Sequence, residues 1–282
     1  MSDVMNAPPQ PAMKTEMVPG TQGAPIWYEL MTTEPAAVAP YYRATLGWEI
    51  PAEGHAMPNG SEYREIGRAD GGFAGGVLTL TPMMCESGAK PGWLPYFYVD
   101  DVDAAAGKVW ELGGRVQMAP TTIDGVGRIA MVEDGQGAAF YLMKPTPPAG
   151  DPNAQSDVFD PVKPGHCRWN ELNTTDPAAA LDFYLALFGW TKGMTMPMGE
   201  AGDYQMIEAG GVMIGAVSPC LGKPTAWLPY FGVTEIAAAK EAATANGGTI
   251  IDDMQEIPGG EFSLVATDPS GAALGYVGPK GA

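Results

Sequence analysis

Short stretches in which apolar residues cluster or alternate with polar ones recur along the chain in two series. Residues 26–31 and 168–172 open the two series, and their bulky or alternating side chains are typical of a strand. Further apolar runs predict strands at 61–67, 73–80, 93–99, 128–133 and 138–143, and again at 203–208, 212–217, 261–267 and 272–277 and at the start of 227–248. The pattern therefore predicts six strands in each series.

Two helices are expected in each series. Thr33-Glu34-Pro35 and Thr175-Asp176-Pro177 place a capping residue before a proline at the first helical position, and an Ala-rich stretch with aromatic residues follows each. Gly47 and Gly189 supply the glycine that commonly ends a helix. Residues 102–112, repeated within 227–248, predict the second helix. Each series is thus βαββ followed by βαββ, an α+β pattern.

The two series are copies of one another. Residues 23–48 match 165–190 at an offset of 142, and Trp-Leu-Pro-Tyr-Phe occurs at both 93–97 and 227–231. A repeat of this length exceeds a solenoid unit of roughly 20–50 residues, so each copy should be a folding module. We expect a flexible tail at 1–22, one domain at 23–144, a Pro-rich linker at 145–164 and a second domain at 165–280.

Composition narrows the class of protein. The 282 residues are 45% hydrophobic, and 33 acidic residues against 15 basic ones give a formal charge of −18. Such a charge disfavours nucleic acid and anionic membrane surfaces as partners. The chain has no secretory signal pattern and no run of ~18 apolar residues that would span a membrane. Three scattered cysteines indicate neither disulfides nor a cysteine zinc site, so we expect a cytoplasmic protein.

Several motifs together resemble the glyoxalase/bleomycin-resistance/extradiol-dioxygenase superfamily, also called vicinal oxygen chelate (VOC) proteins, over about residues 23–280. They are Asp176-Pro177, Phe183-Tyr184, Gly189-Trp190, Val99-Asp100-Asp101-Val102-Asp103 and Asp268-Pro269-Ser270-Gly271. The two-module subgroup labelled glyoxalase-like or hydroxylase is the most similar. The resemblance implies a tandem duplication of paired βαβββ modules, whose curved mixed sheets form open cups.

The resemblance also implies where a metal would bind, and those positions lack suitable ligands. Metal-dependent members hold the ion with His, Gln or Glu on strands that line the cup. The corresponding positions are Trp27, Leu94 and Tyr141 in the first copy and Trp169, Leu228 and Gly275 in the second. Because a divalent metal needs several His, carboxylate or thiolate ligands, we predict no metal and no other cofactor. A divalent Fe, Zn, Mn or Ni ion held in an unusual way stays as the alternative.

Two glutamates are candidate catalytic residues. Strand side chains alternate between faces, so Glu29 shares the face of Trp27, and Glu171 shares that of Trp169. Burial against aromatic rings would raise the pKa of either acid and suit it to act as a general base. The alternative is that both acids only accept hydrogen bonds that fix the repeated architecture. Only two histidines occur, and His166 is the one that we consider as a partner for Glu29 or Glu171.

Aromatic side chains are the candidate ligand-binding residues. Their positions on the inward-facing side of the strands favour a flat or apolar organic ligand, unless the rings simply fill the cup. The candidates are Trp27, Tyr96, Tyr98 and Tyr141 in the first copy and Trp169 and Tyr230 in the second. Gly232 and Gly275 replace tyrosines of the first copy, so we expect the second cup to be the roomier one.

The sequence therefore predicts a protein, monomeric or homodimeric, that binds a small apolar or aromatic molecule in an aromatic-lined cup without the usual metal site. The alternative function is an enzyme of the glyoxalase, lyase, epimerase or dioxygenase type that uses Glu29 or Glu171 as general base. Neither the ligand nor the cup that binds it follows from the sequence.

Overall fold

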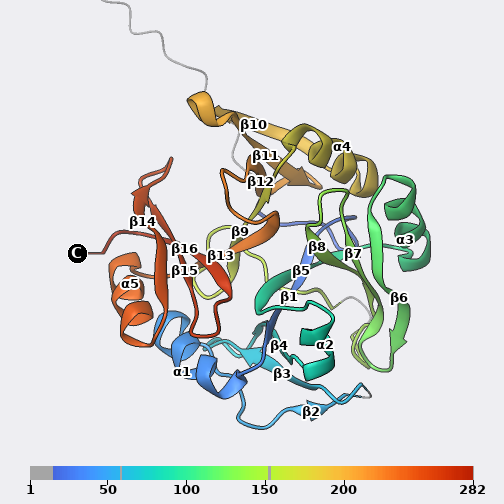
Figure 1. Cartoon of the computed structure of the whole chain (residues 1–282), viewed down its shortest axis with the longest axis horizontal. Coiled ribbons are helices and arrows are strands. Elements are labelled where there is room, and N and C mark those ends of the chain that lie inside the picture. Colours follow the sequence, from blue (N-terminus) through green and yellow to red (C-terminus); the bar gives the residue numbers. More distant parts are fainter. Residues whose placement is uncertain (1–14, 58, 152–153, 282) are drawn as a thin grey trace, which may run out of the picture.

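The computed structural model describes residues 15–57, 59–151 and 154–281. They form two eight-stranded mixed sheets in tandem, one for each copy of the repeat (Figure 1). The α+β class is as predicted, and each half of each sheet follows the βαβββ order that the family resemblance implied. Residues 1–14 of the expected N-terminal tail lie outside the described part of the chain.

The first sheet defines the first module. Its strands lie in the order β2 (His55–Ala56), β3 (Glu62–Gly67), β4 (Phe73–Thr79), β1 (Pro25–Thr32), β5 (Gly92–Tyr98), β8 (Ala139–Pro145), β7 (Gly127–Glu133) and β6 (Arg115–Ile123). In the middle of the sheet, β1 pairs with β4 in parallel and with β5 antiparallel, and β5 pairs with β8 in parallel. The first strands of the two βαβββ halves are thus neighbours.

The second sheet, which defines the second module, repeats this topology. Its strands lie in the order β10 (Thr191–Pro197), β11 (Asp203–Ala209), β12 (Val212–Pro219), β9 (Cys167–Thr174), β13 (Ala226–Gly232), β16 (Ala273–Gly278), β15 (Phe262–Thr267) and β14 (Thr249–Glu256). Here β9 lies between β12 and β13, and β13 pairs with β16. Corresponding residues of the two modules therefore occupy corresponding places in the two sheets.

The helices of the described chain are α1 (Pro35–Leu46), α2 (Pro82–Glu86), α3 (Val102–Glu111), α4 (Pro177–Phe188) and α5 (Ile236–Ala245), with a 3-10 turn at Gly199–Ala201. All but α2 begin and end close to where the sequence predicted, and the short α2 was not predicted. The backbone of Gly47 (φ 68°) and Gly189 (φ 71°) is left-handed, which lets these glycines end α1 and α4. No helix within the described ranges is long and apolar enough to cross a membrane.

The outer strands β2, β6, β10 and β14 were not predicted. They lie at the ends of the two sheets, and most of their residues are exposed. An edge strand with little buried surface carries little of the apolar alternation that identifies a strand. Each module therefore has eight strands where the hydrophobic pattern indicated six.

The two modules interlock through their helices. In Figure 1, α1 of the first module lies beside α5 of the second, and α4 of the second lies beside α3 of the first. From α1, the Tyr42 hydroxyl donates to Asp268 Oδ2 of the second module at 2.9 Å. From α4, Tyr184 donates in the same way to Asp134 Oδ2 of the first module at 3.1 Å. Each module thus donates a hydrogen bond to a buried carboxylate of the other.

A single apolar core joins the helix-bearing faces of both sheets. Phe97 of β5 packs against Trp190 and Trp227 of the second module, with ring centroids 5.2 and 5.3 Å away. Phe231 of β13 packs in turn against Trp48 and Trp93 of the first module. Because residues of both modules fill this core, the opposite face of each sheet remains for function.

Candidate functional site

The candidate site residues gather on the sheet face that looks away from the shared core. In the first module Trp27 pairs with Tyr96, which pairs with Tyr141, and Glu29 pairs with Leu94. We call this the first inner face. The second inner face has the same layout: Trp169 pairs with Tyr230, Tyr230 with Gly275, and Glu171 with Leu228. The strand alternation in the sequence thus placed both glutamates beside their tryptophans.

Each inner face has a tyrosine, missed by the sequence analysis, that accepts a hydrogen bond from the tryptophan of that face. On the second face, Trp169 Nε1 donates to the Tyr204 hydroxyl (2.7 Å), which donates to Glu171 Oε2 (2.9 Å). On the first face, Trp27 Nε1 donates to the Tyr63 hydroxyl at 2.6 Å. The signal was in the repeat, because these tyrosines occupy equivalent places on predicted strands, 141 residues apart (204 − 63 = 141).

The first inner face is packed closed around Glu29. The rings of Tyr96 and Tyr141 stack with centroids 4.1 Å apart, and the Tyr96 hydroxyl donates to Glu29 Oε2 at 2.7 Å. Glu29 is only 3% exposed, and its Oε1 has no hydrogen-bond partner among the described residues. Burial raises the pKa of Glu29 to about 7, against a smaller lowering effect of the nearby Tyr96 and Tyr141 hydroxyls.

Apolar side chains complete the first face. They form a cluster separate from the shared core, made of Leu94, Tyr96, Ile129, Tyr141 and Met143 with Ile26, Trp27, Met31, Met118, Ile123, Met131 and Ala139. Tyr98 lies outside this cluster, where its hydroxyl donates to Asp100 Oδ1 at 2.8 Å and accepts a hydrogen bond from Lys144. The first face therefore resembles a small core built around one carboxyl group.

At seven equivalent positions the second inner face carries a smaller or more polar side chain than the first, and at two others the change runs the other way, with Met206 in place of Glu65 and Ala216 in place of Gly76. The pairs, first module before second, are Met31 and Asn173, Leu78 and Ser218, Met118 and Asp252, Ile129 and Ser263, Met131 and Val265, Tyr141 and Gly275, and Met143 and Val277. Two hydroxyls, an amide and a carboxylate thus replace aliphatic groups.

Glu171 is consequently more open than Glu29. It is half-buried, and besides Tyr204 it accepts hydrogen bonds from Asn173 Nδ2 (3.1 Å) and the Tyr230 hydroxyl (3.4 Å), both at Oε1. Trp169, Tyr204 and Tyr230 are also half-buried. A molecule on this face would therefore reach a carboxylate and three aromatic side chains.

The room expected beside the glycines of the second face is taken by neighbouring side chains. A Cβ atom on Gly275 would lie 2.1 Å from the ring of Tyr230, and one on Gly232 would lie 2.5 Å from Cδ of Arg168. Arg168 is fixed there by Glu261, with Nη1···Oε1 and Nη2···Oε2 distances of 3.0 and 2.8 Å. The expectation that these glycines leave open space does not hold. Glu171 and Tyr230 are nevertheless half-buried, whereas the equivalent Glu29 and Tyr96 are buried.

Comparison with known proteins agrees with this architecture. Residues 25–142 and 163–276 match the model of the Glyoxalase/Bleomycin resistance protein/Dioxygenase superfamily. The chain belongs to this superfamily.

Two relatives match almost the whole chain of this glyoxalase-superfamily protein. CFP32 of Mycobacterium tuberculosis, named as a candidate glyoxylase, is 32% identical over 260 residues, which cover 92% of the chain and 95% of that protein. The anthracycline biosynthesis protein DnrV of Streptomyces peucetius is 30% identical over 274 residues, covering 90% and 93%.

Solved structures of the superfamily share the fold. The Mn(II)-bound glyoxalase from Novosphingobium aromaticivorans matches with a TM-score of 0.61 at 12% identity, covering 91% of the chain and 82% of that structure. An extradiol ring-cleaving dioxygenase from B. fuscum matches with a TM-score of 0.63 at 16% identity, covering 94% and 74%. At such low identity these matches establish the fold alone.

The residues at the superfamily's metal positions do not fit a metal ion. The structure keeps these positions on the inner faces, where they hold Trp27, Leu94 and Tyr141 in the first module and Trp169, Leu228 and Gly275 in the second. Indole, aliphatic and phenol groups are poor ligands for a divalent cation. Among the described residues, no three or more His, Cys, Asp or Glu side chains are grouped so that they could hold a metal.

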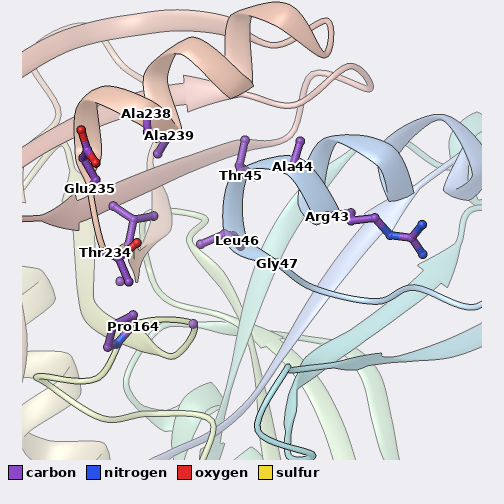
Figure 2. Close-up of a pocket in the computed structure, with 13 residues that line it drawn as sticks. Arg43, Ala44, Thr45, Leu46, Gly47, Pro164, Thr234, Glu235, Ala238 and Ala239 are labelled. Atoms are coloured by element: carbon purple, nitrogen blue, oxygen red, sulfur yellow. The ribbon is translucent and has the colours of Figure 1, made fainter. Parts of the chain in front are cut away.

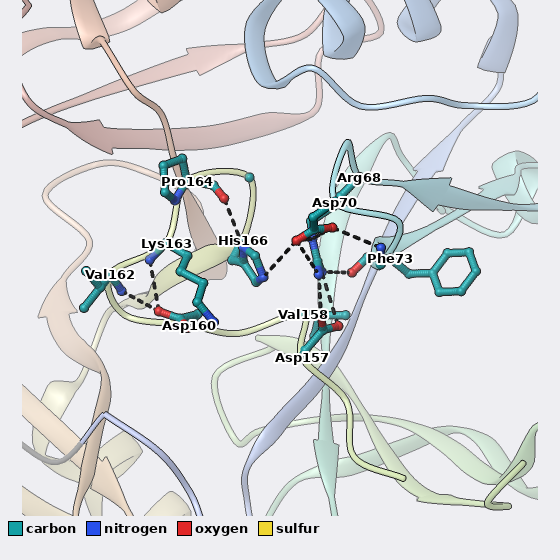
Figure 3. A network of polar contacts seen from close by, with 12 residues as sticks. Arg68, Asp70, Phe73, Asp157, Val158, Asp160, Val162, Lys163, Pro164 and His166 are labelled. Atoms are coloured by element: carbon teal, nitrogen blue, oxygen red, sulfur yellow. Dashed lines mark hydrogen bonds and ion pairs between the residues drawn. The ribbon is translucent and has the colours of Figure 1, made fainter. Parts of the chain in front are cut away.

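His166 belongs to a network of polar contacts with Pro164 and Asp70 in which neither glutamate takes part (Figure 3). Its Nδ1 lies 3.0 Å from the Pro164 carbonyl, and its Nε2 lies 3.9 Å from Asp70 Oδ2. The hydrogen bond from the backbone N–H of Gly72 and the Arg68 guanidinium hold the pKa of Asp70 below its usual value. Since Arg68 also pairs with Asp157, this network ties the β3–β4 turn to the segment that joins the modules.

Two cavities lie at the seams between the modules. The larger, about 340 Å³ and open to solvent, is lined by the end of α1, Pro164-Gly165 and the start of α5 (Figure 2). The smaller, about 150 Å³, is bounded by Leu112, Gln136 and the first turn of α4. Neither of these two cavities is lined by Glu171, Trp169, Tyr204 or Tyr230.

Proposed function

We propose that the protein binds a small, flat organic molecule on the second inner face, with no metal in the usual superfamily position. The observation that carries this proposal is that seven positions of the second face hold smaller or more polar side chains than their equivalents on the first, and that Glu171 is half-buried where Glu29 is only 3% exposed. Aliphatic groups seal the first face around Glu29, whereas Asn173, Ser218 and Asp252 stand at equivalent positions of the second. The first module would then act mainly as a scaffold.

The side chains of the second face suit an aromatic ligand. Trp169 and Tyr230 offer ring surface for stacking, while the Glu171 carboxylate and the Asn173 amide orient polar substituents. The relative DnrV is named for anthracycline biosynthesis, and anthracyclines are polycyclic aromatic compounds. This relationship supports a planar, fused-ring ligand.

An enzyme is the second candidate, and the accessibility of Glu171 favours it over one based on Glu29. A general base must reach the proton that it removes, and Glu29 is almost fully enclosed. In this alternative, Glu171 removes a proton from a carbon next to a carbonyl of the bound molecule. Glu171→Gln would then abolish exchange of that proton for deuterium in D₂O while binding persists.

We expect the neutral probe 2-(hydroxymethyl)anthraquinone to bind the protein, as measured by isothermal titration calorimetry. Trp169→Phe should weaken binding by about 3- to 10-fold, because it removes indole stacking surface and the hydrogen bond that orients Tyr204. The repeat supplies a matched control, since Trp27→Phe makes the equivalent change on the first face. An equal or larger loss in the Trp27 variant would contradict the choice of face, and absence of binding would contradict the proposal itself.

A further inference from the structure

We infer that the ligand of the second inner face carries a protonated amine, which Glu171 binds among Trp169, Tyr204 and Tyr230. This inference rests on the proposed function and adds the charge of the ligand to it. It begins with the surroundings of Glu171, whose hydrogen-bond partners in the described chain are two tyrosine hydroxyls and one amide. All three are neutral donors.

The cations near this face are already paired with other acids. Arg168 makes its two hydrogen bonds to Glu261, and Lys223 Nζ lies 2.6 Å from Asp252 Oδ2. Within the described ranges, no Lys, Arg or His nitrogen lies within ion-pair distance of Glu171. The carboxylate is therefore free to pair with a cationic group of a ligand, which would add to its neutral hydrogen bonds.

The aromatic residues around Glu171 favour the same kind of ligand. An ammonium group is attracted to the faces of Trp and Tyr rings, and three such side chains are half-buried beside the carboxylate. The chain's formal charge of −18 also attracts cations and repels anionic ligands.

The first face encloses its central glutamate, whereas the second leaves Glu171 half-buried. The Trp, Glu and Tyr residues recur in both modules, but on the first face Tyr141 and four methionines surround the glutamate. An amine could not reach Glu29 without moving the stacked Tyr96 and Tyr141 rings. The second face joins a half-buried central glutamate to half-buried aromatic side chains, whereas the accessible carboxylate of the first face, Glu65, lies 3.5 Å from His55 Nε2.

Three probes that share one ring system test this inference: 2-(aminomethyl)anthraquinone, 2-(hydroxymethyl)anthraquinone and anthraquinone-2-carboxylate. By calorimetry at pH 7, the amine should bind roughly 5- to 30-fold more tightly than the alcohol, and the carboxylate more weakly than both. In Glu171→Gln the advantage of the amine should fall below about 3-fold, while the alcohol still binds. Raising the salt concentration should also reduce the advantage in the unmodified protein.

Glu111→Gln is the matched control, because it removes one negative charge from an exposed position of α3 and should leave the advantage of the amine intact. Circular dichroism should verify that both variants are folded. Equal binding of amine and alcohol, or an advantage that survives Glu171→Gln, would overturn this inference and leave the proposed function standing. Binding of none of the probes would overturn the proposed function, and this inference with it.

Discussion

Replacing Phe231 by alanine should lower the free energy of unfolding of the whole chain by about 3–5 kcal/mol, as is typical for deletion of a buried phenylalanine ring. Phe231 belongs to β13 of the second module and is fully buried. Its ring packs against Tyr28, Trp48 and Trp93 of the first module, with centroid distances of 5.9, 4.8 and 5.0 Å. The cavity left by the substitution would therefore remove contacts of both modules at once.

Urea denaturation followed by circular dichroism, together with calorimetry, would measure this effect. We expect one cooperative transition, shifted as a whole, because the modules share their core. Phe97→Ala should behave alike, since Phe97 makes the equivalent contacts from the first module. Trp110→Ala, at a site 69% exposed on α3, should change stability by only about 0.5 kcal/mol. Two transitions, of which only one moves, would contradict the shared core.

The central elements of the fold follow from local signals in the sequence. Proline at the first helical position and glycine after the last were enough to locate α1 and α4. The strands in the middle of each sheet are buried on at least one face, so their apolar residues stand out. The edge strands β6 and β14 lacked this signal because water covers most of their side chains.

The interlocking of the modules could not be predicted, because it depends on contacts between residues far apart in the chain. The motif residues Tyr184 and Asp268 were noticed as features of the family. Nothing in the local sequence indicates that Tyr184 bonds Asp134, or that Asp268 accepts from Tyr42. Such pairs are fixed by how the two sheets pack.

The site was predicted in part. Strand alternation placed Glu29 and Glu171 beside the tryptophans, whereas the tyrosines that bond them depend on which strands are neighbours in the sheet. An alignment of the two copies of the repeat already contains the difference in polarity between the two inner faces. It becomes interpretable only when the strand register identifies which residues share the inner face.

The second large effect concerns the buried carboxyl of Glu29 and its dependence on pH. Burial raises the pKa of Glu29 in the folded protein to about 7, above the ordinary value of 4.5 that applies to an unfolded chain. As the pH rises from 4.5, the unfolded state therefore loses this proton first. The folded state then binds more protons than the unfolded one, so the free energy of unfolding falls with rising pH.

The stability that Glu29 contributes should be complete below about pH 4.5 and lost by about pH 7, a change on the order of 3 kcal/mol. Glu29→Gln has no carboxyl to titrate at this position, so its free energy of unfolding should lack this decline. The free energy of unfolding of the wild type should therefore fall relative to that of the variant between about pH 4.5 and pH 7. Urea denaturation at a series of pH values measures the difference, with Glu111→Gln as the control for removal of a carboxyl group. Only an enclosed carboxyl without a charged partner resists ionisation in this way. If the difference in free energy of unfolding between wild type and Glu29→Gln stayed constant from about pH 4.5 to about pH 7, water or a cation would have to reach Glu29.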